Sequence, residues 1–425
     1  MINTDYFKGK KVVIAGLARS GLACANLLYG LGAEVSVTDL QNTETTRLNS
    51  SKLKSPDIKF ELGKHSREFI RGRDLLVISP GIPDEAMPVV WAKEFNIPMA
   101  SEIEVASILC PATIIAVTGS NGKTTTTTLI GKIIQACGKR AFVCGNIGNP
   151  FTGEVEKMSE GDFVSLEVSS FQLEKIKTFK PKAAVILNFS KNHLDRYKDM
   201  QEYLEAKKRI FRNQDKSDFL VLNHEDPVLC NIAKEARSKV IYFRGEKDFN
   251  PDQSAVLSVA GILNIKREVC LNVFHGFKGL EHRMEYVAKI NGVDFINDSK
   301  ATTVESAVWA LRNIKSSIIL IAGGKDKGVD YSLVLPEAKD KVKKVILIGE
   351  AKNKIRSAFG NRLPVLDAET LPDAVKMAFA LASCGDSILL SPMCSSFDMF
   401  KDYEERGRIF KSAVHSLAPA DGVKL

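Results

Sequence analysis

A glycine-rich turn that contains a lysine and a threonine is the part of the sequence best suited to chemistry. The run Gly119-Ser120-Asn121-Gly122-Lys123-Thr124 follows the apolar stretch Ala112–Thr118 and precedes a predicted helix from Thr125 to Ile134. Glycines in such a turn allow backbone N–H groups to face an anion at a helix N-terminus. Lys123 would reach the outer phosphates of ATP, and the Thr124 hydroxyl would face Mg²⁺. The order strand, turn, helix therefore predicts an ATP site, even though two residues separate the glycines where four are usual.

Two further predicted strands end near side chains that could hold a metal ion. The strand Asp162–Val168 carries Glu167 close to its carboxyl end, and the loop after the apolar strand Ala183–Asn188 carries His193. Each residue by itself is more often structural. Beside an ATP turn, a carboxylate and an imidazole together are suited to a Mg²⁺ site. We therefore expect the three strands to bring these groups to one edge of one sheet.

A lysine interrupts the apolar face of a predicted helix from Asp199 to Asn213. The apolar residues recur at helical spacing: Met200, Tyr203, Leu204, Ile210 and Phe211. Lys207 falls on this face, whereas Lys208 points away from it. The Lys207 stem could extend along the apolar surface with its amine in water. Alternatively, Lys207 is buried and is chemically altered or linked to a metal, because an isolated charge is rarely buried. The pattern leaves both interpretations open.

The N-terminal stretch imitates a dinucleotide-binding pattern. A predicted strand, Lys11–Ala15, is followed by the turn Gly16–Gly21, a helix from Leu22 to Gly30 and a second strand, Glu34–Asp39. In the dinucleotide pattern the middle of three glycines admits a pyrophosphate to the backbone. Here that position is Ala18, whose Cβ would crowd the pyrophosphate. The sequence therefore favours a Rossmann-like module for a nucleotide other than NAD.

Strands and helices alternate along the remaining sequence. At 425 residues the chain is long enough for about three domains. We predict an α/β fold with mostly parallel sheets: a Rossmann-like domain at 1–101, an ATP-binding domain of P-loop type at 102–280 and a third α/β domain at 281–425, which the family resemblance described below implies to be Rossmann-like. Asn291-Gly292 predicts a hairpin at the start of the last domain.

Composition excludes several other classes of protein. The formal charge is +8, but lysine and arginine are scattered without a basic block, which argues against a nucleic-acid partner. The eight cysteines include no C-x-x-C pair, which fits reduced thiols. The polar N-terminus does not resemble a signal peptide, and no apolar run is long enough to span a membrane. We expect a cytoplasmic protein, with a monomer as the default.

Taken together, the motifs resemble those of the Mur ligases of bacterial peptidoglycan synthesis, and the resemblance covers nearly the whole chain. The matching segments are Thr118–Thr124, Glu167–Glu174, His193–Tyr197, Tyr203–Lys207, His282-Arg283, Asn297–Thr302 and Leu390–Ser396. The segment Glu167–Glu174, with Phe171-Gln172-Leu173, is similar to the one typical of family members that add D-glutamate.

The resemblance implies an amide-forming reaction. The carboxylate of UDP-N-acetylmuramoyl-L-alanine (UDP-MurNAc-L-Ala) would attack ATP to give an acyl phosphate, and the amine of D-glutamate would then displace phosphate. ATP and two Mg²⁺ ions would be required. Two alternatives remain. One is another Mur-type or folylpolyglutamate-synthase-like ligase, against which Phe171-Gln172-Leu173 argues. The other is a nucleotide-sugar-binding protein that has lost catalysis.

The resemblance also implies roles for individual residues. Those at the UDP-sugar substrate would be Ser20, Asp39, Ser79, Pro80, Gly81, Asn146, Ser169 and His193. Those at ATP would be Gly119 to Thr125, Asn250, Arg283 and Asp298. Those at the metal ions would be Thr124, Glu167, His193 and Lys207, the last as a carbamate. Those at D-glutamate would be Thr302, Lys327, Ser396 and Tyr403. Lys123, Glu167, His193, Lys207 and Lys300 would be catalytic, with Lys300 near the reacting carboxylate.

The sequence departs from the family pattern in three places. Asn192 replaces an acid before the histidine, and Thr303 replaces a common asparagine. The stretch between the strand Val240–Phe243 and the next helix is also much shortened. We predict that Asn250 either contacts adenine or caps a helix that begins at Pro251 and runs through Ala255 to Leu263.

Overall fold

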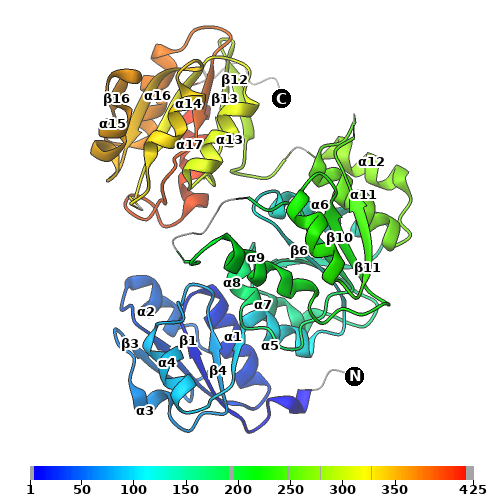
Figure 1. Ribbon diagram of the computed structural model, residues 1–425. Helices are drawn as coiled ribbons and strands as arrows, with labels where there is room; N and C mark the ends of the chain where they lie inside the picture. The colour runs from blue at the N-terminus through cyan, green and yellow to red at the C-terminus, as the bar shows by residue number, and fades with distance from the viewer. Residues whose placement is uncertain (1–3, 191–195, 247, 278, 327, 418–425) are drawn as a thin grey trace. The chain divides into compact units, whose positions relative to one another are not determined.

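The computed structural model describes residues 4–190, 196–246, 248–277, 279–326 and 328–417 (Figure 1). The chain forms two compact units, Met1–Phe277 and Lys278–Leu425. The first unit contains two parallel sheets and the second contains one mixed sheet, all flanked by helices. The predicted α/β fold class is therefore confirmed.

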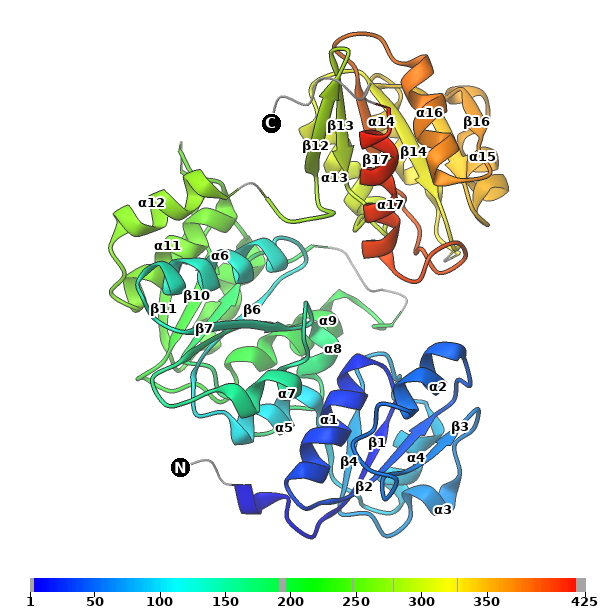
Figure 2. The same cartoon turned by 180° about the vertical axis from the view of Figure 1, so that it is seen from behind.

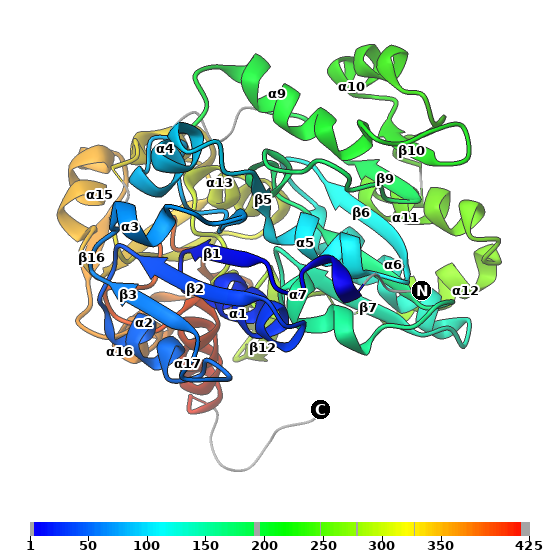
Figure 3. The ribbon, with the colours of Figure 1, turned by 90° about the horizontal axis from the view of Figure 1, so that it is seen from below.

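The first sheet has the doubly wound topology expected of a nucleotide-binding module (Figure 3). Its strands lie in the order β3-β2-β1-β4-β5 and are all parallel. They are β1 (Lys11–Ala15), β2 (Glu34–Asp39), β3 (Lys59–Leu62), β4 (Leu75–Ile78) and β5 (Met99–Ser101). The strand order reverses between β1 and β4, so the residues that follow these two strands lie where ligands bind in such sheets.

The second sheet carries the glycine turn at its centre. Its order is β11-β10-β9-β6-β8-β7, again parallel throughout. The strands are β6 (Thr113–Thr118), β7 (Ala141–Gly145), β8 (Phe163–Glu167), β9 (Ala183–Ile186), β10 (Phe219–Asn223) and β11 (Lys239–Phe243). Because β8 and β9 flank β6, the three strand ends named above meet at one edge of one sheet, as predicted.

Both faces of this sheet are buried by helices. Ile115 and Val117 of β6 pack toward α6 (Lys123–Ala136), α11 (Pro251–Ile262) and α12 (Arg267–Gly276). The alternate residues Ile114 and Ala116 belong to the core on the other face, which α5 (Glu102–Leu109) and α7 (Phe151–Glu154) cover (Figures 1 and 2). Burial of both faces explains why the strand reads as a continuous apolar run.

The second unit is built on a six-stranded sheet of order β12-β13-β17-β14-β15-β16. Its strands are β12 (Glu285–Ile290), β13 (Val293–Asn297), β14 (Ile318–Gly323), β15 (Val342–Ile348), β16 (Val365–Asp367) and β17 (Ser387–Leu390). Only β12 runs antiparallel to its neighbour. The turn between β12 and β13 has positive φ at Asn291 and Gly292, which confirms the predicted hairpin.

The remaining helices connect and cover the strands. They are α1 (Arg19–Gly30), α2 (Glu44–Ser50), α3 (Arg67–Ile70), α4 (Met87–Glu94), α8 (Ser170–Leu173), α9 (Met200–Lys208), α10 (Pro227–Ile232), α13 (Val304–Asn313), α14 (Leu335–Ala338), α15 (Lys352–Phe359), α16 (Leu371–Leu381) and α17 (Tyr403–His415). Within the described residues, none of the helices has the length and apolarity needed to cross a bilayer.

Several predicted boundaries were wrong by a few residues. Helix α1 starts at Arg19, so Ser20 lies in its first turn. Helix α9 ends at Lys208 and continues as a short 3₁₀ turn, Arg209–Phe211, where the sequence predicted one helix to Asn213. Helix α11 begins at Pro251, as the capping argument predicted, but ends at Ile262.

Candidate active site

The glycine turn after β6 is held by its neighbours on the sheet. Gly122 has φ 81° and is the N-cap of α6, a left-handed conformation that glycine adopts without steric cost. The Asn121 N–H donates to Asn188 Oδ1 at 2.8 Å, and the Asn188 amide donates back to the Asn121 carbonyl at 3.2 Å. The turn is therefore rigidly tied to the end of β9.

The lysine of this turn lies across the turn itself. Lys123 Nζ donates to the carbonyls of Gly119 and Ser120 at 2.9 and 3.0 Å. Thr124, one residue into α6, is buried. An ammonium group, a hydroxyl and the N-terminus of a helix thus share one small region, which is the donor set that a nucleotide phosphate needs.

Glu167 ends the neighbouring strand and is almost fully buried. Its Oε1 accepts a hydrogen bond from the Asn146 side chain at 2.9 Å. Its Oε2 is buried without a hydrogen-bond partner among the described residues. A buried carboxylate oxygen without a donor is costly unless a cation or ligand satisfies it. The predicted metal-binding role of Glu167 fits this geometry.

Lys207 of α9 is buried beside the same turn. Its side chain is 2% exposed, and Nζ donates to the Gly119 carbonyl at 3.1 Å. Nζ also lies 4.6 Å from the centre of the Tyr203 ring. Burial, and secondarily the charge of Lys123, lower the pKa of Lys207 well below its ordinary value. Burial thus favours the neutral form of the amine, and the interpretation in which the stem carries the amine out to water was wrong.

Lys208, the next residue, lies off the apolar face of α9, as predicted, and is paired with carboxylates. Lys208 points away from the core and forms ion pairs with Glu205 and Glu235 at 2.8 and 2.6 Å. Loss of hydration is the largest single contribution and lowers the pKa of Lys208, but the hydrogen bonds and charges of the two carboxylates together outweigh it and raise the pKa. Two adjacent lysines thus have contrasting environments.

Two predicted site residues lie outside the described residues: His193 and Lys327. Among the residues that the structure describes, no cluster of three or more His, Cys, Asp or Glu side chains could hold a metal ion.

The end of the first sheet has its own set of close contacts. Asp39, the last residue of β2, accepts from the Leu17 and Gln41 N–H groups at 2.7 and 2.8 Å. A Cβ on Gly16 would lie 2.7 Å from Ser79 Oγ, so glycine is required between these strand ends. Ser169, in the second sheet, caps α8 through a reciprocal hydrogen-bond pair with Gln172.

In the second unit, the predicted residues cluster around the ends of β13 and β17. Asp298 Oδ1 accepts from the Met284 N–H, and Oδ2 accepts from the Ser391 hydroxyl, both at 3.2 Å. Burial raises the pKa of Asp298 to about 7, although those hydrogen bonds and the charge of Arg283 oppose the increase. Lys300 Nζ lies 5.6 Å from the ring centre of Tyr403.

The sequence analysis missed a buried arginine in this cluster. Arg406 of α17 is fully buried and donates to Ser299 Oγ, the Ser299 carbonyl and the Cys394 carbonyl at 3.0, 2.8 and 3.2 Å. It therefore ties the loop carrying Lys300 and Thr302 to the loop carrying Ser396. Its place on the apolar face of α17, with Phe410 one turn later, is the signal that could have revealed it, as it revealed Lys207.

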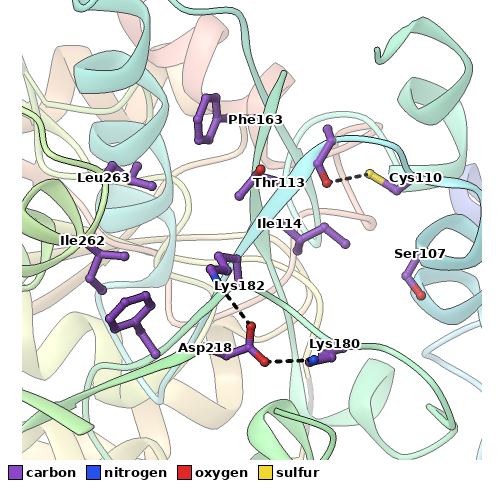
Figure 4. A pocket seen from close by; sticks show the side chains of 12 residues that line it. Ser107, Cys110, Thr113, Ile114, Phe163, Lys180, Lys182, Asp218, Ile262 and Leu263 are labelled. Carbon is purple, nitrogen blue, oxygen red and sulfur yellow. Dashed lines mark hydrogen bonds and ion pairs between the residues drawn. The ribbon is translucent and has the colours of Figure 1, made fainter. Parts of the chain in front are cut away.

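The cavity in Figure 4, of about 530 Å³, does not belong to this site. It is lined by Thr113, Phe163 and Phe219, which begin β6, β8 and β10, so it lies at the amino edge of the sheet. Asp218 there pairs with Lys180 and Lys182 at 3.2 and 3.6 Å. The glycine turn, Glu167 and Lys207 are at the carboxyl edge.

Each of the three α/β sheets carries polar side chains at its carboxyl edge, and comparison with known proteins identifies the class of protein to which this arrangement belongs. The Mur ligase MurD-like N-terminal domain matches residues 10–101, the Mur ligase middle domain matches 117–284, and the Mur ligase glutamate ligase domain matches 282–394. The chain belongs to the Mur ligase family.

Individual relatives extend the similarity over nearly the whole chain. UDP-N-acetylmuramoylalanine–D-glutamate ligase of Geotalea daltonii is 42% identical over 97% of this chain and 99% of its own length. The ligase of the same name from Thermoanaerobacter pseudethanolicus is 41% identical over 96% and 99%.

Solved structures show the same fold at lower identity. UDP-N-acetylmuramate-alanine ligase MurC of Thermotoga maritima has a TM-score of 0.62 at 17% identity and covers 96% of this chain and 100% of its own. MurF ligase of Thermotoga maritima, in complex with ADP, has a TM-score of 0.59 at 15% identity and covers 98% of each chain.

Proposed function

We propose that this protein ligates D-glutamate to UDP-MurNAc-L-Ala, with cleavage of ATP to ADP and phosphate, in peptidoglycan precursor synthesis. The observation that carries the proposal is the similarity, over nearly the full chain, to ligases of that name. The glycine turn with Lys123, and the buried groups around it, provide the ATP chemistry that the reaction needs.

The first step is phosphoryl transfer to the alanyl carboxylate. The glycine turn and the N-terminus of α6 bind the ATP phosphates, and Lys123 neutralises charge on the outer phosphates. Phosphoryl transfer depends mainly on alignment and charge neutralisation, so rigidity of the turn matters. The Asn121–Asn188 pair supplies that rigidity.

Glu167, Thr124, His193 and Lys207 are the residues proposed to hold Mg²⁺. Two observations fit this assignment: Glu167 has an unpartnered buried oxygen, and Lys207 has a lowered pKa. A neutral lysine amine reacts with CO₂ to give a carbamate and a proton. The side chain, which is ordinarily a cation, thereby becomes an anionic oxygen ligand. When bound, Mg²⁺ supplies neutralisation of charge that develops on the transferred phosphoryl group.

The second unit is proposed to supply the groups for D-glutamate. Thr302, Ser396, Tyr403 and Lys327 would bind the amino acid, and Lys300 would lie near the reacting carboxylate. Arg283 and Asp298 would contact the ATP end. At the first sheet, Ser20, Asp39 and Ser79-Pro80-Gly81 would bind the UDP portion, with Asn146 and Ser169 nearer the muramoyl group. We propose a cytoplasmic monomer with domains at 1–101, 102–280 and 281–425.

The test is incorporation of labelled D-glutamate into UDP-MurNAc-L-Ala with ATP and Mg²⁺. We expect one ADP released for each D-glutamate joined, and no product with L-glutamate. Product formation with UDP-MurNAc or with a pteroate acceptor, but not with UDP-MurNAc-L-Ala, would favour another ligase of the family. Binding of the UDP substrate without ADP release would indicate a catalytically silent protein.

A further inference from the structure

Arg196 joins the two sheets of the first unit at the end of β4. Its guanidinium donates from Nη1 to the Pro80 carbonyl at 2.9 Å and from Nη2 to the Ile82 carbonyl at 3.0 Å. One planar group therefore holds the backbone on both sides of Gly81. The two-pronged geometry of a guanidinium allows this, whereas a lysine amine acts as a single point.

The same guanidinium is anchored on the central-sheet side. It lies 4.4 Å from the centre of the Phe171 ring, and Nη2 is 3.5 Å from Glu174 Oε2. The other oxygen of Glu174 accepts from the Tyr197 hydroxyl at 2.6 Å. The Tyr197 ring stacks on Phe171 with centroids 5.7 Å apart. The Phe171 ring thus packs on the guanidinium of Arg196, and Glu174 pairs with one of its nitrogens. The same guanidinium also donates to Pro80 and Ile82.

The hydrogen bonds from Arg196 determine the direction of the backbone N–H groups in the Ser79–Ile82 turn. In a planar trans peptide, the C=O of one residue and the N–H of the next point in opposite directions. Because the Pro80 carbonyl points at Arg196, the Gly81 N–H points away from it. That N–H has no acceptor among the described residues, whereas the neighbouring Ile82 N–H is taken by the Ser79 carbonyl at 3.0 Å. Arg196 therefore sets the orientation of the Gly81 N–H, at a residue whose backbone would otherwise be flexible.

We propose that Arg196 is a positioning residue for the UDP-sugar substrate. It fixes the Ser79–Ile82 turn in the conformation that presents the Gly81 N–H to an anionic group of that substrate. The inference rests on the proposed function, which places the UDP portion at this turn. On the other side, Arg196 packs on Phe171 of the central-sheet region.

A matched control lies at the same junction. Lys175 pairs with Asp84 at 2.8 Å and also connects the two sheets, but the ion pair involves no backbone of the Ser79–Ile82 turn. Replacing Lys175 by alanine should therefore leave the Gly81 N–H where it is. A general loosening of the junction would affect this variant as well.

The experiment is calorimetry on the full chain, with UDP-MurNAc-L-Ala and MgADP titrated separately. We expect Arg196→Lys to weaken UDP-MurNAc-L-Ala about tenfold or more, which corresponds to ~1.4 kcal/mol. The MgADP affinity of Arg196→Lys should change less than about twofold. In Lys175→Ala, the affinities for UDP-MurNAc-L-Ala and for MgADP should both change less than about twofold. In turnover, the KM for UDP-MurNAc-L-Ala should rise while those for ATP and D-glutamate do not. Arg196→Ala should show a larger loss.

Three outcomes would overturn the proposal. Unchanged UDP-MurNAc-L-Ala affinity in Arg196→Lys would exclude the positioning role while leaving the proposed function intact. Equal losses of both ligands, with a lower melting temperature, would make Arg196 a general structural residue. Failure of the unmodified protein to bind UDP-MurNAc-L-Ala, while it binds MgADP, would overturn the proposed function and this inference together.

Discussion

Two turns in this molecule share the order strand, glycine turn, helix, yet their glycines have different neighbours. In the first turn, a Cβ on Gly21 would lie 1.9 Å from the Gly16 carbonyl oxygen, which is fixed backbone of the same turn. In the second, a Cβ on Gly122 would lie 2.2 Å from Asp252 Oδ1, the end of a side chain that can rotate. The first glycine permits close packing of α1 on the backbone of its own turn, whereas the second admits the Asp252 carboxylate beside the turn that we propose binds ATP.

The starts of the two helices differ in the same way. Helix α1 is preceded by Ala18, which is extended and has no side-chain cap hydrogen bond. Helix α6 is preceded by Gly122 in the left-handed conformation and begins with Lys123. Both helices begin with a basic residue, but Lys123 donates to the carbonyls of its own turn, whereas Arg19 donates to the Gly148 carbonyl at 3.5 Å. The comparison teaches that glycine spacing alone does not separate a packing turn from a phosphate turn, and the variants below test this distinction.

The largest expected effect is at Lys207, which donates to the Gly119 carbonyl of the second turn. Lys207→Ala should reduce ligase activity to below about 1%, because the variant lacks the amine that we propose becomes an anionic metal ligand in a charge-dependent transition state. Short-chain carboxylic acids should restore part of it by occupying the vacated space. Ligase rates with and without added acid are the measurement.

Lys208→Ala is the control for this variant. Its ion pairs with Glu205 and Glu235 are partly solvated, so the loss should be no more than about 1 kcal/mol of stability, with activity nearly unchanged. Full activity of Lys207→Ala without added acid would show that no carbamate is needed.

The next largest effects are expected from alanine substitutions of the two glycines, Gly21 and Gly122. Gly21→Ala should destabilise the protein by about 1–3 kcal/mol, since the Gly16 backbone must move. Gly122→Ala costs about 1–2 kcal/mol of left-handed strain and also displaces Asp252, so MgATP affinity should fall about tenfold. Thermal melting and MgATP calorimetry on both variants are the measurements. If Gly21→Ala weakened MgATP while Gly122→Ala affected only stability, the distinction between the turns would be reversed.

Asp298, directly after β13 in the second unit, is a buried acid at the end of a strand, and its ionisation can be tested. Asp298 has a pKa of about 7 in the folded chain, against an ordinary value near 3.9. Between about pH 4 and pH 7, the folded state therefore holds a proton that the unfolded state has lost. The free energy of unfolding should fall across this window as the pH rises, by at most about 4 kcal/mol, and should be independent of Asp298 above it.

Asp298→Asn should remove that pH dependence, because asparagine resembles the protonated acid. Denaturant unfolding of both proteins at pH 4.5 and 7.5 gives the comparison. A wild-type protein that becomes more stable relative to Asp298→Asn as the pH rises would contradict the assignment.

Much of this arrangement could be predicted from the sequence, because it depends on local patterns. Buried parallel strands read as apolar runs, and their ends carried Lys123, Glu167 and Asp298. Lys207 was identified because a cation on an apolar helical face conflicts with the pattern around it. The conflict itself was the signal, and the structure shows the side chain buried.

The contact partners of the missed residues are not encoded in local patterns, even though the apolar face of α17 could have indicated that Arg406 is buried. Arg196 reaches Pro80 and Ile82, more than a hundred residues earlier in the chain. Arg406 reaches Ser299 across a similar separation. Asp252 lies against Gly122 because α11 packs on α6, which depends on the tertiary fold. The roles assigned to His193 and Lys327 stay predictions, since both residues lie outside the described part of the chain.

The smallest expected effect is at Asn250, where the shortened segment leads into α11 beside the second turn. Its Oδ1 accepts from the Gln253 N–H at 2.9 Å, and its own N–H donates to Gln253 Oε1 at 3.1 Å, so the predicted cap is confirmed. The cap uses the oxygen of the side chain and leaves the Nδ2 group as a donor for an adenine nitrogen. The two roles can therefore be separated by substitution. Asn250→Asp keeps the cap, because aspartate caps as well as asparagine, but it removes the amide donor.

We expect Asn250→Asp to raise the ATP KM about threefold to tenfold, with an unchanged melting temperature and an unchanged KM for D-glutamate. Asn250→Ala loses both contributions, so its melting temperature should also fall by roughly 1–4 °C for a cap of ~1 kcal/mol. An unchanged ATP KM in Asn250→Asp would make Asn250 a cap only. Adenine would then be recognised elsewhere, and the shortened segment would contribute to the second turn only by starting the helix that carries Asp252.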